Sequence, residues 1–66
     1  MKVELYKKYY DKCGHFYLVT NIDLNAPKGY EVTVVNERSG QEEHYNLNGQ
    51  YSLAGKSIYD LIGIEK

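Results

Sequence analysis

The sequence predicts a small all-β domain, and three observations indicate this fold class. Eight of the 66 residues are tyrosine, whereas there is one phenylalanine and no tryptophan. Tyrosine suits a half-buried sheet surface, because its ring is apolar and its hydroxyl must stay wet or find a partner. Glycine-containing turns separate the apolar runs, and no run keeps helical spacing beyond one turn. We therefore expect residues 1–66 to form a single domain, a five-stranded antiparallel meander.

The strands are predicted from the turns between them. A first strand over about residues 2–10 is linked by residues 11–14 (DKCG) to a second strand over 15–22. Residues 25–29 (NAPKG) form the next turn, before a third strand over 31–35, and residues 36–40 (NERSG) lead into the fourth strand. Glycine, proline and asparagine favour turns because each restricts or relaxes φ in a useful way.

Asn48-Gly49 is the clearest turn signal in the chain. It lies between residues 44–47 (HYNL) and 50–53 (QYSL). Both of its residues tolerate the positive φ of a type I′ turn, whose twist matches that of a two-residue hairpin. We therefore expect a β-hairpin centred on this pair.

Apolar residues on both faces of the second strand predict a curved sheet. One face carries Phe16, Leu18, Thr20 and Ile22, and the other carries Tyr17 and Val19. The tail over residues 57–64 is apolar enough for a closing strand; alternatively, Ser57 caps a single helical turn with Asp60 at its third position. The expected architecture is thus an open barrel of the SH3-like type, or a sheet packed on a second copy.

The short chain and its single cysteine limit the sources of stability. A chain of this length buries only about 60% of the surface that it exposes when unfolded. Cys13 has no partner for a disulfide within the chain, which favours a reducing compartment. We see no signal region and no apolar run near the roughly 18 residues that a membrane span needs. We expect a cytoplasmic protein with no membrane partner. Either good packing of the aromatic residues or self-association into a homo-oligomer would supplement its stability.

The C-terminal half resembles a group of known sequences. Residues 48–51 (NGQY), 55–57 (GKS) and 59–62 (YDLI) resemble the end of many small, uncharacterised proteins encoded by bacteriophages and prophages. In those proteins an Asp/Asn-Gly-Arg/Gln-Tyr turn precedes a Gly-x-Ser segment and an Asp-Leu-Val-like step. The resemblance covers roughly residues 30–64. It implies a small β-fold and a phage or mobile-element origin, hence the cytoplasm of a host cell, and it supplies no reaction or binding site.

Residues with catalytic or metal-binding chemistry are few. Cys13 and His15 are two residues apart, but a nucleophilic cysteine also needs a group that orients its base, and none is evident. With His44 they supply three zinc ligands at most, without a paired motif. Glu42 and Glu43 are adjacent in a strand and face opposite ways, so they form no acid–base pair. No glycine motif for phosphate is present. We expect no enzyme, no metal and no cofactor.

Aromatic and basic residues gather near the N-terminus. The candidate binding residues are Tyr6, Lys8, Tyr9, Tyr10, Lys12 and Tyr17. Tyrosine with a charged rim is typical of protein interfaces. The same mixture suits single-stranded nucleic acid or a small nucleotide, although the net charge of −1 is not the positive balance that such binding usually shows. In a third interpretation, five tyrosines complete a small core with their hydroxyls at the surface: Tyr6, Tyr17, Tyr30, Tyr45 and Tyr51.

These observations favour a non-catalytic binding module. We predict a phage accessory protein that docks on a host protein and modulates it. The contact is expected on the N-terminal strand, and the acidic hairpin over residues 37–43 offers a second surface. The alternative is a binder of single-stranded nucleic acid or of a small nucleotide.

Overall fold

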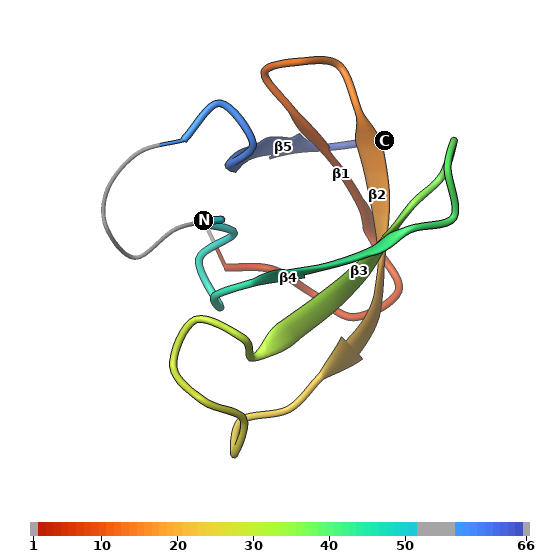
Figure 1. The fold of residues 1–66 in the computed structure, drawn as a ribbon. Coiled ribbons are helices and arrows are strands. Elements are labelled where there is room, and N and C mark those ends of the chain that lie inside the picture. Colours follow the sequence, from red (N-terminus) through yellow and green to blue (C-terminus); the bar gives the residue numbers. More distant parts are fainter. Residues whose placement is uncertain (1, 52–56, 66) are drawn as a thin grey trace.

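The residues that the structure describes form one antiparallel sheet of five strands. The computed structural model describes residues 2–51 and 57–65, and these contain no helix, hence none that could cross a membrane. The strands are β1 (Lys8–Asp11), β2 (Phe16–Ile22), β3 (Val32–Asn36), β4 (Glu42–Tyr45) and β5 (Leu61–Ile64). Their order is β4-β3-β2-β1-β5, so the first four form a meander and β5 returns to lie beside β1 (Figure 1). The predicted all-β class and antiparallel pairing are confirmed.

The sheet is open, with β4 and β5 as its two edges. No strand pairing joins these edges in the described ranges, so the predicted barrel is not shown. The chain near the edges is nevertheless cross-linked. The Tyr45 hydroxyl donates to the Tyr59 carbonyl at 2.8 Å, and the Leu61 N–H donates to the Gly49 carbonyl at 2.8 Å. These two bonds bring the start of β5 close to the end of β4.

The N-terminal strand is shorter than predicted. β1 covers four residues, Lys8–Asp11, instead of residues 2–10. Tyr6 has a φ of 63°, a left-handed conformation that interrupts an extended chain. The segment before β1 is still attached to the sheet, because Val3 N–H donates to Leu47 and Tyr6 N–H donates to Val19.

A β-bulge in β2 changes which residues face the core. The pairing with β3 shifts register between Val19 and Asn21. Tyr17 and Val19 are buried before the shift, and beyond it Ile22 also packs against the core, opposite Val32. An extra residue in one strand moves the following side chains to the other face. The predicted grouping of Ile22 on one face with Phe16, Leu18 and Thr20 is therefore wrong.

The Asn48-Gly49 turn forms with a different geometry from the predicted one. Gly49 has a φ of 81°, but Asn48 has no positive φ, so the turn is not type I′. Asn46 N–H donates to Gln50 and Gly49 N–H donates to Asn46, both at 3.0 Å, which encloses a three-residue loop ending in a left-handed glycine. The Asn46 side chain favours this loop by accepting the Asn48 and Gln50 N–H groups at 2.9 Å. No strand includes residues 50–51, and residues 52–53 of the predicted strand lie outside the described residues.

The other predicted turns are present. Residues 36–40 connect β3 to β4, with Gly40 N–H donating to Asn36 at 2.8 Å. The tail forms the closing strand β5, which a non-helical turn precedes in place of the alternative helical turn. In the turn, Ser57 Oγ accepts the Tyr59 N–H at 3.1 Å and Asp60 Oδ2 accepts the Ser57 N–H at 3.0 Å. This reciprocal pairing is that of a capping box, although no helix follows it.

Tyrosine makes up much of the core. The buried apolar residues are Val3, Tyr9, Tyr17, Val19, Val32, Val34, Tyr45 and Leu61. The expectation that tyrosine completes the core is thus confirmed for Tyr17 and Tyr45. The expectation that their hydroxyls lie at the surface is wrong. The Tyr17 hydroxyl donates to Asp11, and the Tyr45 hydroxyl donates to the Tyr59 carbonyl. The other three tyrosines of that group are exposed, at 72% for Tyr6, 60% for Tyr30 and 42% for Tyr51.

Two turn glycines allow backbone strain to be separated from crowding. Both have positive φ, 81° at Gly49 and 84° at Gly14, but a Cβ on Gly49 would lie 3.2 Å from Leu61 Cβ, whereas one on Gly14 meets nothing within 4 Å. We expect Gly14→Ala to lower the free energy of unfolding by about 1 kcal/mol through strain alone. Gly49→Ala should lower it by about 2–3 kcal/mol, because crowding is added. Urea denaturation followed by circular dichroism measures both, and equal losses would contradict the crowding at Gly49.

Candidate functional site

A buried carboxylate organises the hairpin between β1 and β2. Asp11 is 2% exposed and accepts four hydrogen bonds. Its Oδ1 accepts the Cys13 N–H at 2.9 Å and the His15 N–H at 3.0 Å. Its Oδ2 accepts the Tyr17 hydroxyl at 3.1 Å and lies 3.2 Å from His15 Nδ1. Asp11 therefore fixes the turn backbone and one core tyrosine together.

These contacts determine the ionisation of both partners. Burial alone would raise the pKa of the Asp11 carboxyl, but the hydrogen bonds from the His15 backbone, the His15 ring and the Tyr17 hydroxyl hold it below its ordinary value. Burial, followed by the bond to Asp11, raises the pKa of Tyr17 to about 12. At neutral pH the site therefore contains an ionised carboxylate and a neutral phenol.

The residues with metal-binding chemistry form a different cluster from the one considered in the sequence. Ligand atoms of Asp11, Cys13 and His15 lie within 4.8 Å of one another. His44 is elsewhere, on β4, with its ring 5.9 Å from that of Tyr30. The Asp11 oxygens already accept four hydrogen bonds, and these bonds hold the turn of the β1–β2 hairpin in place. The cluster is thus explained without a metal.

Asp11 also orients His15, a role for which the sequence offered no candidate. A cysteine nucleophile would further need its thiol within hydrogen-bond reach of the imidazole. Among the contacts of residues 2–51 and 57–65, no hydrogen bond joins the Cys13 thiol to the His15 ring. The absence of an enzymatic activity stays a prediction.

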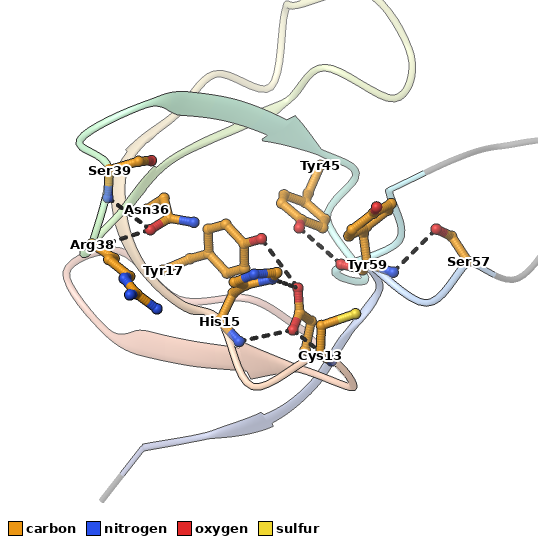
Figure 2. A network of polar contacts seen from close by, with 10 residues as sticks. Cys13, His15, Tyr17, Asn36, Arg38, Ser39, Tyr45, Ser57 and Tyr59 are labelled. Carbon is orange, nitrogen blue, oxygen red and sulfur yellow. Dashed lines mark hydrogen bonds and ion pairs between the residues drawn. The ribbon is translucent and has the colours of Figure 1, made fainter.

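Tyr17 also lines a hollow of about 290 Å³. We call it the tyrosine concavity, and it is lined by Tyr17, Glu43, Tyr45, Tyr51 and Tyr59. The four rings pack edge to face in series, with centroid separations of 5.9 Å, 5.4 Å and 5.5 Å from Tyr17 through to Tyr59. Figure 2 shows Tyr17, Tyr45 and Tyr59 following one another across this part of the molecule. Such edge-to-face pairs hold rings in defined positions.

The tyrosine concavity combines buried rings with exposed ones. Tyr17 and Tyr45 are buried at its base, at 4% and 0% exposure. Tyr51 and Tyr59 are each 42% exposed and present part of their rings to solvent. Two fixed rings thus support two that a partner can reach.

The charge of the tyrosine concavity is negative. Glu43 is half-buried, and its Oε1 accepts the Tyr51 hydroxyl at 3.2 Å. The charge and the hydrogen bond of Glu43 raise the pKa of Tyr51, and burial is the main cause of the raised pKa of Tyr45. Within residues 2–51 and 57–65, the residues that line the tyrosine concavity include no lysine and no arginine.

The six residues predicted to bind a partner do not share one surface. Successive side chains of a strand point to opposite faces, so Tyr9 is buried at 2% exposure while Lys8 is exposed on the other face. Tyr17 is also in the core, and Tyr10 is half-buried with its ring centroid 6.1 Å from that of Phe16. Tyr9 and Tyr17 therefore expose almost no surface that a partner could contact directly.

The remaining predicted residues are accessible but separate. Tyr6 is 72% exposed in the segment before β1, and Lys12 is exposed in the hairpin turn. Lys8 Nζ lies 2.6 Å from Glu37 Oε1, and this contact raises the pKa of the Lys8 ammonium. The lysine is thus already paired with an acid of the neighbouring hairpin.

Most of the tyrosine concavity was absent from the predicted binding residues. Glu43, Tyr45, Tyr51 and Tyr59 are spread over 17 positions, and only the pairing of β4 and the return of the chain to β5 bring them together. The excess of tyrosine in the sequence signalled an aromatic site. The spacing of the tyrosines does not show which of them come together, or that Glu43 joins them. The comparisons with known proteins add no further guide: no family profile, no curated protein and no solved structure matches the chain.

Proposed function

We propose that this protein is a non-catalytic binding module that docks on another protein through the tyrosine concavity. The observation that carries the proposal is the pair of half-exposed rings, Tyr51 and Tyr59, supported by two buried ones. Tyrosine is prominent among residues that dominate binding energy. Rings already held by their neighbours lose little freedom on binding.

The partner that we propose is a host protein, and the setting is a phage infection or a prophage. The basis is the resemblance at residues 48–51 and 59–62, segments that include Tyr51 and Tyr59. In this proposal the protein acts in the host cytoplasm and modulates its partner by occupying a surface. We also propose that the sheet is an open barrel of the SH3-like type. The bonds of Tyr45 to Tyr59 and of Leu61 to Gly49, between its two edges, support that description.

Binding of single-stranded nucleic acid has less support. Two of the four candidate stacking rings, Tyr9 and Tyr17, are buried, and Lys8 is paired with Glu37. Such binding relies on exposed rings beside free cationic groups. Protein docking needs only the exposed rim that the tyrosine concavity has.

A pull-down from bacterial lysate with matched variants tests the proposal. The tagged protein is used with and without nuclease, beside Tyr59→Ala and the control Tyr30→Ala, whose ring is 60% exposed outside the tyrosine concavity. We expect one partner that survives nuclease, is retained by Tyr30→Ala, and is reduced roughly tenfold by Tyr59→Ala, as for a binding hot spot. Equal recovery by both variants would contradict docking at this site, and recovery that vanishes with nuclease would favour nucleic acid.

A further inference from the structure

We infer that the tyrosine concavity receives the guanidinium group of an arginine side chain on the partner. This inference rests on the proposed function and specifies the chemistry of the same site. Three properties of the tyrosine concavity lead to it: its charge, its exposed aromatic rings and its size.

The charge calls for a cation. Glu43 is half-buried in β4, and its one hydrogen bond in the described structure comes from the neutral hydroxyl of Tyr51. A carboxylate has about four acceptor positions, so most of its capacity remains. The ionised Asp11 accepts the Tyr17 hydroxyl, and its charge adds to the negative potential at Tyr17 and Tyr45. Among the residues that the structure describes, no lysine or arginine lines the tyrosine concavity, so a positively charged ligand would complement it.

The rings favour a cation that is flat and weakly hydrated. The faces of tyrosine attract cations, and arginine is the side chain most often found there. A guanidinium can stack on an aromatic ring while its N–H groups reach a carboxylate in a two-point contact. Tyr51 and Glu43 are already joined by a hydrogen bond, so ring and carboxylate are adjacent. Lysine offers a strongly hydrated point charge, which stacks less well.

The size suits one side chain. The tyrosine concavity has a volume of about 290 Å³. Pockets for drug-sized ligands or cofactors occupy about 300–1,000 Å³. A hollow at the lower limit of that range accommodates the end of a long side chain, while the rest of the partner contacts the exposed edges of Tyr51 and Tyr59.

An NMR titration of the ¹⁵N-labelled protein tests the inference directly. The probe is Nα-acetyl-arginine methylamide, and its matched control is Nα-acetyl-citrulline methylamide, which has nearly the same shape without the charge. We expect saturable shifts at Glu43, Tyr45 and Tyr51 with the arginine probe, and roughly tenfold weaker binding of the citrulline probe. Equal binding of the two probes, or no shift at these residues, would overturn the inference. The comparison uses the unaltered protein.

Two variants and a third probe locate the recognition. Glu43→Gln should reduce the affinity for arginine to that for citrulline. Tyr51→Phe keeps the ring and removes the hydroxyl that donates a hydrogen bond to Glu43. Arginine binding should therefore be retained. Nα-acetyl-lysine methylamide should bind more weakly than arginine, and equal binding would contradict recognition of a planar cation.

The inference and the proposed function can fail separately. If the arginine probe binds as expected while no partner depends on Tyr59, the docking proposal fails and the cation site stands. If a partner depends on Tyr59 while the arginine probe causes no shift, docking stands and the arginine inference is overturned.

Discussion

Replacing Asp11 with alanine is expected to lower the free energy of unfolding by about 3 kcal/mol. A hydrogen bond to a charged group contributes about 1.5–3 kcal/mol, and Asp11 accepts four bonds at 2% exposure, partly offset by the desolvation that the carboxylate no longer undergoes. The change also leaves the buried Tyr17 hydroxyl without its partner. A domain of this size rarely has more than about 3–5 kcal/mol of stability, so Asp11→Ala should be close to unfolded at 25 °C.

Guanidinium denaturation followed by circular dichroism measures this effect. Asp23→Ala is the matched control, because Asp23 is exposed in a loop and its carboxylate accepts the Asn25 N–H in the described structure. The control should change stability by less than about 1 kcal/mol. Asp11→Asn, which keeps the shape but turns an NH₂ group toward N–H and O–H donors, should resemble Asp11→Ala. Similar denaturation midpoints for Asp11→Ala and Asp23→Ala would contradict the role of Asp11 in stabilising the β1–β2 turn.

The Asp11 carboxylate also makes the free energy of unfolding depend on pH in the acid range. The folded pKa of Asp11 lies below its ordinary value of 3.8. The contribution of Asp11 is therefore fully present above that value, and it is lost as the pH falls through the lowered pKa of the folded state. Guanidinium denaturation of the unaltered protein at several pH values should therefore show the free energy of unfolding falling as the pH drops below 3.8.

The turns could be predicted from the sequence because local chemistry determines them. Gly14, Gly40 and Gly49 all have positive φ within turns that were placed by their glycines. The details of a turn were harder, as Asn48-Gly49 shows. The Asn46 side chain accepts two backbone N–H groups and stabilises a three-residue loop, whereas the dipeptide alone predicts a two-residue one.

Features that depend on the whole sheet could not be read from local pattern. The bulge in β2 reverses the face of Ile22, and nothing in the spacing of that strand signals the extra residue. Tyr9 and Tyr10 look alike in sequence, yet the strand places one in the core and leaves the other half-buried on the outer side. The tyrosine concavity requires β4 and the turn before β5 to meet, which is a property of topology.

Raising the pH from 8 to 12 is expected to unfold the protein through its buried tyrosines. Tyr17 has a folded pKa of about 12 against 10.0 for an ordinary tyrosine, chiefly because of burial, and burial raises the pKa of Tyr45 as well. A raised pKa means that the fold favours the neutral phenol. The stability is therefore fully present below pH 10, the value of the unfolded chain, and it is lost as the pH rises from 10 toward 12.

The magnitude should be enough to unfold so small a domain. One pKa unit corresponds to about 1.4 kcal/mol, so Tyr17 alone loses about 3 kcal/mol over this interval, and Tyr45 acts in the same direction. Absorbance at 295 nm reports tyrosinate, and far-ultraviolet circular dichroism reports the sheet. We expect Tyr17 and Tyr45 to ionise together with unfolding, in one cooperative step.

Two phenylalanine variants distinguish unfolding caused by ionisation of the buried tyrosines from a general effect of alkali on the protein. Tyr17→Phe removes one buried phenol, so the slope of unfolding free energy against pH between 10 and 12 should fall by about one proton, or about 1.4 kcal/mol per pH unit. The slope is informative even though this variant also loses the bond to Asp11, because a constant loss of stability shifts the curve without changing its slope. Tyr30→Phe, at a 60% exposed position, should keep the slope of the unaltered protein. If all tyrosines instead ionise near pH 10 before the sheet unfolds, Tyr17 and Tyr45 are accessible to solvent, and the fixed base that the tyrosine concavity requires is absent.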